Sequence, residues 1–392
     1  MNKLSFYIHE ISGALGDLPL FFILIVGLSQ HAGFNPLSIL FWSGLCHIVI
    51  GFIFKIPLPL QPMKAMGLYA ITYGVSQGEL LLAGFCLGVV ILILNDLHLF
   101  EKLYRFFPQA VIRGIQLGLG IVFLKKAFEL IFSTPSPLMG EEWGEGVLIG
   151  ILFFFVIFFL FFFFHKLQFL LTFLIFGFGI FVLSDSGVLA FPHIGFSLEF
   201  LQLPLLSSPD SFMSSSTQTI LLLILIQLPL TMANSIFSPA LLIQDEFPQS
   251  HVGVSEISKS VGLVNLLTCP FGGMPSCHGA GGLAAQMIFG ARTGFSIVFL
   301  GFLKITVALL LGSFFLTLAT HFPKPLLGIL FIFPAFDLCK RAFLIRGFKE
   351  VVSLVATSCA FVFWHAGGAL LVGSGVYYGV QYLRKGIYEA TH

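Results

Sequence analysis

Charged residues are scarce in this sequence. Asp, Glu, Lys and Arg make up 9% of its 392 residues, which is about a third of their usual share in a soluble protein, while 57% of the residues are hydrophobic. So little charge excludes a water-exposed globular surface over most of the chain. Several stretches of about twenty residues, the length that a membrane helix needs, contain no charged side chain: 18–54, 147–164, 211–244, 305–323 and 351–383.

Other absences narrow the function further. The net charge is only +1 and the basic residues form no cluster, so the sequence predicts no nucleic-acid partner. The six cysteines show no CxxC motif and no disulfide-like spacing. The N-terminal region has no small-residue cleavage site, so we expect a retained first helix and not a signal peptide.

The apolar stretches predict an all-α polytopic membrane protein with about fourteen transmembrane segments. The third and tenth segments are too short to cross the bilayer, so we predict that they are half-helices. The predicted segments are residues 11–30, 36–54, 62–76, 79–98, 108–131, 146–164, 168–186, 217–238, 254–269, 276–289, 295–319, 324–343, 349–365 and 367–384.

The distribution of charge between the segments predicts the topology. The loop at 186–216 contains Glu199 and Asp210 but no Lys or Arg, so the positive-inside rule places the linker 191–216 outside the cytoplasm. Seven segments then precede the linker and seven follow it, which puts both the N-terminus and the C-terminus in the cytoplasm. We expect a multi-pass protein of the cell membrane, either a bacterial inner membrane or a plasma membrane.

An internal repeat divides the chain in the same way. FPQAVIRGIQLGLGIVFLKKAF at 107–128 aligns without gaps with FPKPLLGILFIFPAFDLCKRAF at 322–343. Because each half has an odd number of segments, the second half is inverted relative to the first, which is a common plan among transporters.

Two irregular stretches interrupt the apolar pattern at matching places in the two halves. They are PLPLQPMKAMGLYAITYG at 57–74 and GGMPSCHGAGGLAAQMIFGARTG at 272–294. Irregular backbone at membrane depth survives only where protein or a watery cavity satisfies its polar groups. Alternating prolines favour an extended run, with a helix beginning near Pro62. We therefore predict two extended pieces, each followed by a half-helix, that meet at the membrane midplane.

Two helix N-termini that meet in this way predict an anion site, because each carries a partial positive charge and unpaired N–H groups. His278 and Ser276 have side chains that could also donate, although a packed histidine and a helix-capping serine explain them equally well. Cys277 and His278 have no further ligands at metal-like spacing, so we expect no metal and no other cofactor. The substrate-binding candidates are Met63, Lys64 and Ala65 in the first half and Ser276, Cys277, His278 and Gly279 in the second.

Lys64 strengthens the prediction of an anion-binding site. A cation in the first turn of a helix opposes the helix dipole, and a charge inside a membrane is costly. Both costs fall if an anion lies between the lysine and the helix end. The alternative is that Lys64 reaches a membrane surface or pairs with an acid.

Three further polar residues are candidates for coupling or for support of the site. Asp17 precedes a long apolar stretch, so it lies within the membrane, where it could balance Lys64 or carry a coupling proton. Gln227 and Asn234 flank Pro229 in the eighth segment and either point their amides at the site or join helices by hydrogen bonds. Glu10 is expected at the membrane interface.

Three motifs in this chain resemble those of the molybdate transporter family, which is related to the sulfate permeases. They are ISGALGDLP at 11–19, PLPLQPMKAMG at 57–67 and FGGMPSCHGAGGLAAQMIFGARTG at 271–294. The resemblance implies fourteen segments in two inverted repeats of seven, with the substrate between the third and tenth half-helices. It also adds Gln61 to the substrate-binding residues.

The resemblance further implies two domains and a homodimer. The core, or substrate-binding, domain would comprise residues 1–100 and 217–320, and the gate domain residues 101–190 and 321–392. Sulfate permeases usually carry a soluble regulatory domain after the last segment. We expect this domain to be absent, because the sequence ends soon after the fourteenth predicted segment.

These observations predict a secondary active transporter of a tetrahedral oxyanion that works by alternating access. Molybdate is the leading substrate, with a proton as the candidate coupling ion and the lipid bilayer as the surroundings. Sulfate is the main alternative, and a nucleobase transporter or a passive anion channel is less favoured. We expect no enzymatic activity, because Ser276, Cys277 and His278 have no visible orienting partner for a nucleophile.

Overall fold

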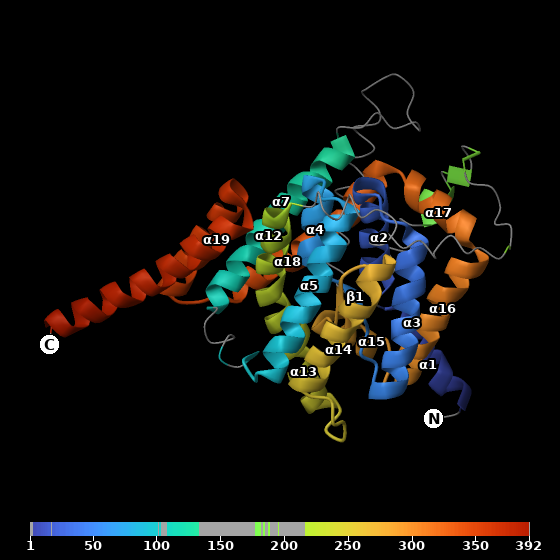
Figure 1. Ribbon diagram of the computed structural model, residues 1–392, viewed down its shortest axis with the longest axis horizontal. Helices are drawn as coiled ribbons and strands as arrows, with labels where there is room; N and C mark the ends of the chain where they lie inside the picture. Colours follow the sequence, from blue (N-terminus) through green and yellow to red (C-terminus); the bar gives the residue numbers. More distant parts are fainter. Residues whose placement is uncertain are drawn as a thin grey trace.

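The computed structural model of the protein describes residues 3–16, 18–100, 102, 108–132, 177–181, 183–184, 187–188, 195 and 216–391. Predicted segment 146–164 lies outside the described residues, as do most of segment 168–186 and most of the linker 191–216. Nearly all of the described chain is helical, as the sequence predicts (Figure 1).

The first half contains six described helices and one short strand. These are α1 (Lys3–Leu15), α2 (Leu18–Ala32), α3 (Pro36–Phe54), β1 (Gln61–Pro62), α4 (Lys64–Tyr73), α5 (Gln77–Asp96) and α7 (Gln109–Phe132).

The second half has the corresponding elements. These are α12 (Thr217–Leu230), the π-helix η2 (Thr231–Phe237), α13 (Ser238–Glu246), α14 (Val254–Thr268), η3 (Cys269–Phe271), β2 (Ser276–Cys277), α15 (Ala280–Ile288), α16 (Gly294–Leu310), α17 (Gly312–His321), α18 (Lys324–Lys340), η4 (Arg341–Leu344) and α19 (Phe348–Thr391).

Three described helices are long and apolar enough to cross a membrane. They are α3, α5 and the continuous stretch Thr217–Glu246. The two short helices that the sequence predicts in place of full segments are present as α4 and α15. The predicted segment 295–319 differs, because α16 and α17 meet at an angle of 92°. The helix breaks at Leu311, and the glycine that follows is a poor continuation of a helix.

Local sequence signals set the ends of the straight helices. α3 begins where Asn35 Oδ1 accepts a hydrogen bond from Leu37 N at 2.9 Å, with a proline in the first turn. α5 begins with a capping box, in which the Ser76 hydroxyl accepts from Glu79 N and the Glu79 carboxylate accepts from Ser76 N.

Predicted segments 11–30 and 217–238, which contain Pro19 and Pro229, break in different ways. Predicted segment 11–30 divides into α1 and α2, and Asp17, which lies between them, is outside the described residues. In the second half the helix continues past Pro229 and then widens into the π-helix η2. Proline has no N–H for the helical ladder, so a rearranged turn beside it is expected.

The packing partners of the helices exchange between the two halves. α3 packs along α16 and α5 packs along α14. α3 and α16 are the second and eleventh predicted segments, and α5 and α14 are the fourth and ninth. Because the second segment corresponds to the ninth and the fourth to the eleventh, interchanging the two halves converts one pair into the other. The contacts of α4 with α12 and of α1 with α15 exchange in the same way. A pseudo-two-fold axis relating the halves produces this pattern.

A second group of helices forms around α7, which packs against both α18 and α19. Phe123 of α7 stacks on Phe331 of α18 with ring centroids 4.5 Å apart. The Ser358 hydroxyl of α19 donates to the Gly114 carbonyl of α7 at 3.0 Å. In Figure 1 this group lies on the side of the molecule opposite α3 and α16.

α19 contains both of the last two predicted segments. Its backbone is helical throughout, yet Lys349 Nζ donates to Tyr377 Oη at 3.1 Å, and Ser353 Oγ donates to the Gly373 carbonyl at 2.9 Å. A straight helix would separate Lys349 from Tyr377 by about 42 Å. The chain therefore reverses between these residues and forms two helical arms side by side. The C-terminal end of α19 projects away from the other helices (Figure 1).

Glycines allow the closest helix contacts, as small residues commonly do in membranes. A Cβ atom at Gly301 of α16 would lie 2.5 Å from the Gly44 carbonyl oxygen of α3. We expect Gly301→Ala to lower the free energy of unfolding by about 1–3 kcal/mol, because the two backbones must move apart. The midpoint of thermal unfolding of the purified protein measures this loss of stability, and monodispersity in detergent is a second measure of it.

Gly375→Ala is the matched control, since Gly375 lies in α19 and a methyl group added there would have nothing within 4 Å. It should leave the unfolding midpoint unchanged or slightly raised. Equal midpoints for the two variants would contradict a tight α3–α16 contact.

Candidate functional site

A two-stranded sheet brings the two irregular stretches together. β1 pairs antiparallel with β2, with Gln61 opposite Cys277 and Pro62 opposite Ser276. The next backbone group continues the pairing, because Met63 N donates to the Pro275 carbonyl at 2.8 Å. α4 begins directly after β1 and α15 shortly after β2. Since the strands are antiparallel, the N-termini of the two helices lie near each other.

Side chains of neighbouring helices satisfy the backbone outside this short sheet. The Asn265 amide of α14 accepts from Ser276 N at 2.8 Å and donates to the Ser276 carbonyl at 2.6 Å, so it acts as a missing strand partner. In the other half, His47 Nε2 of α3 accepts from Leu60 N at 3.3 Å. α3 and α14 are the second and ninth segments, so the same device occurs once in each repeat.

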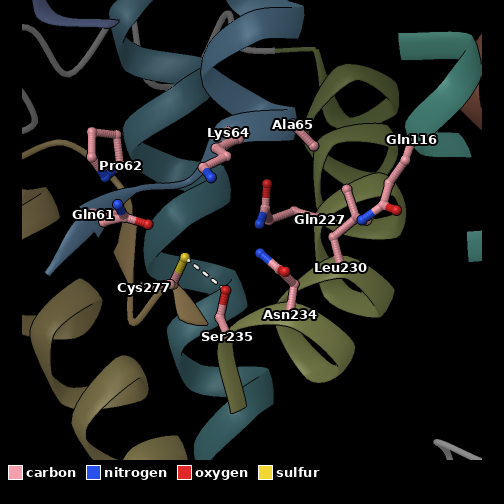
Figure 2. A pocket seen from close by; sticks show the side chains of 11 residues that line it. Gln61, Pro62, Lys64, Ala65, Gln116, Gln227, Leu230, Asn234, Ser235 and Cys277 are labelled. Carbon is pink, nitrogen blue, oxygen red and sulfur yellow. Dashed lines mark hydrogen bonds between the residues drawn. The ribbon is translucent and has the colours of Figure 1, made fainter. Parts of the chain in front are cut away.

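A small pocket lies beside the sheet, between the strands and the π-helix (Figure 2). Its cavity of about 20 Å³ has room for one or two water molecules. The lining residues are Gln61, Pro62, Lys64, Ala65, Gln116, Gln227, Leu230, Asn234, Ser235, Cys277 and Gly279.

Seven of the residues predicted from the sequence line this pocket. Five are predicted substrate-binding residues and two are predicted supporting residues: Gln61, Lys64, Ala65, Cys277, Gly279, Gln227 and Asn234. Asp17, the third supporting candidate, lies outside the described residues.

Three predicted substrate-binding residues, Met63, Ser276 and His278, do not line the pocket. Met63 is fully buried. The Ser276 hydroxyl donates to the Met274 carbonyl at 2.8 Å. His278 Nδ1 lies 2.9 Å from the Pro59 carbonyl, so it donates, and Nε2 lies 2.8 Å from the Ser260 hydroxyl. Their side chains support the irregular backbone, and direct contact with a ligand stays a prediction for these three residues.

The first turn of α4 presents both a cation and backbone donors to the pocket. Lys64 is the first residue of the helix, and its amino group points into the space between Gln61 and Gln227 (Figure 2). Within the described residues, the Lys64 side chain forms no hydrogen bond and no ion pair. The preceding Met63 provides no side-chain cap. Gln227 occupies the N–H of Met66, so the N–H groups of Lys64 and Ala65 remain available to a ligand.

Gln227 fixes the eighth segment against the start of α4. Its Oε1 accepts from Met66 N at 3.1 Å, and its Nε2 donates to the Thr231 hydroxyl at 3.0 Å. The Gln227 amide therefore lines the pocket and also joins two helices.

Gly279 and the Gln61 side chain approach each other closely. A Cβ atom at position 279 would overlap the end of the Gln61 side chain, which would then have to move. Gly279 is also the N-cap of α15 and forms no side-chain cap. Gln61 of the first half therefore lies directly across the start of the half-helix of the second.

The π-helix supplies the opposite wall. Asn234 and Ser235 both lie in η2. The Ser235 hydroxyl donates to Cys277 Sγ at 3.1 Å, which joins η2 to β2 (Figure 2). A π-helical turn within an α-helix is often found at a functional site.

Four residues line the pocket although the sequence did not predict them as site residues: Pro62, Gln116, Leu230 and Ser235. Gln116 had a signal, because it is a polar residue inside the apolar repeat at 107–128. Ser235 depends on the π-helix, which no sequence pattern used above predicts.

The lining is suited to an anion. It offers one ammonium group, the side-chain amides of Gln61, Gln116, Gln227 and Asn234, and two helix N-termini. None of the described lining residues carries a carboxylate. The described part of the chain also contains no cluster of three or more His, Cys, Asp or Glu residues that could hold a metal ion.

Glu10 is buried within the protein, with 1% of its surface exposed. Its Oε1 accepts from Arg292 N at 2.9 Å and from Thr293 N at 3.0 Å, which are the backbone groups just before α16. The carboxylate is buried because it caps a helix N-terminus, where negative charge is favoured.

Similarity to known proteins agrees with this geometry. Residues 9–123 and 219–338 match the family described as Molybdate transporter of MFS superfamily. The chain is 31% identical over 364 residues to Molybdate transporter 1 of Arabidopsis thaliana, covering 85% of this chain and 79% of that protein. It is 27% identical over 415 residues to Molybdate transporter 2 of the same plant, covering 96% and 86%.

Solved structures show the same fold. The transmembrane domain of the cyanobacterial bicarbonate transporter BicA superposes with a TM-score of 0.65 at 17% sequence identity. The superposition covers 94% of this chain and 98% of that one.

Asn265→Leu should destabilise the site, because it leaves the buried N–H and carbonyl of Ser276 without partners. Each buried backbone group left unpaired costs about 1–3 kcal/mol. We expect a lower midpoint of thermal unfolding and faster hydrogen exchange at residues 274–280, measured by mass spectrometry.

Leu267→Ala, at a 59% exposed position of the same helix, is the control and should change neither quantity. Unchanged exchange in Asn265→Leu would show that β2 does not depend on this side chain.

Proposed function

The chain belongs to the molybdate transporter family, and on this premise we propose that it is a secondary active transporter whose substrate is molybdate. It is a multi-pass membrane protein with the fold of anion transporters, and it is a transporter and not an enzyme. The proposal adds the substrate, the mechanism and the residues that hold the anion.

The single observation that carries the proposal is the chemistry of the pocket. Lys64 directs a positive charge into a buried cavity where two helix N-termini meet and where the described lining offers amides and no carboxylate. Removing a charge from water is costly unless a partner of opposite sign is present. An oxyanion between Lys64 and the half-helices provides that partner.

A tetrahedral oxyanion fits the arrangement of donors. Its four oxygens point in different directions, and the donors reach the pocket from β1, α4, η2 and α7. We propose that Gln61, Lys64, Ala65 and Gly279 bind the anion, through side chains or backbone N–H groups. Met63, Ser276 and His278 hold the irregular backbone that presents these donors.

Alternating access accounts for the size of the cavity. The volume of about 20 Å³ is too small for an anion with four oxygens, so the walls must move apart to admit it. We propose that the core domain, residues 1–100 and 217–320, moves against the gate domain, residues 101–190 and 321–392. The packing of α7 against both α18 and α19 supports a gate built around α7.

The proposal also covers the membrane location, the oligomeric state and the coupling ion. We propose a cell membrane location with both termini in the cytoplasm, a homodimer, and Asp17 as the group that carries a coupling proton. In the sequence Asp17 falls between the last residue of α1 and the first residue of α2, and an intramembrane acid is commonly functional.

Binding to the purified protein tests the substrate. Calorimetric titration with molybdate, tungstate, sulfate and uracil should give the tightest binding for molybdate and tungstate. If sulfate binds more tightly than molybdate, sulfate is the substrate and not molybdate. A response to uracil alone would overturn the oxyanion proposal.

Lys64→Met should weaken molybdate binding by about tenfold to a hundredfold, because hydrogen bonds to charged groups contribute about 1.5–3 kcal/mol. The titration is repeated on the variant after its folding is verified by thermal unfolding. Lys259→Met is the control, since Lys259 is an exposed lysine of α14. Equal affinity in Lys64→Met and Lys259→Met would remove Lys64 from the site.

Counterflow in proteoliposomes tests the mechanism. Vesicles preloaded with unlabelled molybdate should accumulate labelled molybdate transiently, because one binding site faces each side in turn. A passive channel gives no such overshoot. Collapse of the pH gradient by an ionophore should slow net uptake if a proton is coupled, while leaving counterflow intact.

A further inference from the structure

Gln116 enters the pocket from a different group of helices than the other lining residues. It lies on α7, which packs against α18 and α19. The remaining described lining residues belong to β1, α4, α12, η2, β2 and the start of α15. The side chain is 2% exposed, so a polar amide is buried at the point where α7 faces the site.

Arg113 fixes the orientation of this amide. Arg113 Nη1 donates to Gln116 Oε1 at 2.9 Å, one helical turn away. A guanidinium group can only donate, so it holds the oxygen of the amide and turns the NH₂ group away from itself. Figure 2 shows the amide nitrogen of Gln116 on the pocket side and the oxygen on the far side.

The orientation matters because an amide can present either a donor or an acceptor to a ligand. With its oxygen held by Arg113, Gln116 offers N–H donors to the pocket. A donor favours an oxyanion, whereas an acceptor would repel one. Arg113 also places a positive charge beside the Gln116 amide.

We propose that Gln116 is a substrate-binding residue of α7 that donates a hydrogen bond to an oxygen of the bound oxyanion, and that Arg113 is its positioning residue. This inference rests on the proposed function, since it names a further contact to the same anion. An anion held by Lys64 on one side and Gln116 on the other joins two helix groups. Its affinity then depends on α7 being next to the site.

The first test is a pair of substitutions at Gln116. Gln116→Leu keeps the approximate volume and removes the donor, and it should weaken molybdate binding about tenfold. Gln116→Glu replaces the donor by a carboxylate facing the anion and should weaken binding about a hundredfold or more. Calorimetric titration measures both, and thermal unfolding verifies that each variant is folded.

Gln109→Glu is the matched control, because it makes the same chemical change at an exposed position of the same helix. It should bind molybdate as the wild type does. If Gln116→Leu also binds as the wild type does, the inference is wrong while the proposed function stands. If the wild type binds no oxyanion, the proposed function fails and the inference fails with it.

A double-mutant cycle tests the role of Arg113. Arg113→Met should weaken binding several-fold when Gln116 is present, because the amide is then free to turn its oxygen to the anion. In the Gln116→Leu background the same change should have no further effect on affinity. Arg113→Lys, which can still donate to the amide, should restore most of the affinity.

Additive losses in the two backgrounds would overturn the positioning role. They would mean that Arg113 acts on the anion directly or through the fold. A purely structural role would also lower the unfolding midpoint in both backgrounds and would not be rescued by lysine.

Discussion

The constraint on which this structure depends is that polar backbone groups inside a membrane must find partners. The chain leaves the helical state twice at the centre, around β1 and around β2, and the two strands are too short to satisfy each other. Side chains complete the pairing. Asn265 bonds both backbone groups of Ser276, His47 accepts from Leu60, and Gln227 accepts from Met66. Asn265 and His47 replace strand partners, whereas Gln227 satisfies an N–H group in the first turn of α4.

The same interactions that solve the backbone problem create the pocket. Holding two half-helices end to end exposes their N-termini to one small space, and an anion is the ligand that this space favours. The two repeats contribute unequally. The first half supplies Lys64, whereas the second supplies Gly279, whose missing side chain lets Gln61 cross the start of α15. The proposed anion site thus combines a repeated backbone arrangement with side chains that differ between the two halves.

The π-helix and α7 complete the site from two directions. η2 turns Asn234 and Ser235 toward β2 within a helix that also carries Pro229. α7, which packs along α18 and α19 and also contacts α4, brings Gln116 to the pocket. A pocket with walls from two groups can open when the groups move, which is the physical basis for the proposed alternating access.

Long uncharged stretches and proline or glycine interruptions have few physical solutions in a bilayer. The membrane class, most of the helix ranges, the repeat and the two short helices α4 and α15 could therefore be predicted from the sequence. The sequence also singled out Lys64, Gln227 and Asn234, which line one pocket. Which other side chains reach that pocket depends on the packing of the helices. It turned His278 toward Pro59 and Ser260, buried Glu10 under the start of α16, and brought Gln116 into the lining. These outcomes depend on contacts between residues far apart in the chain, and no local pattern of spacing contains them.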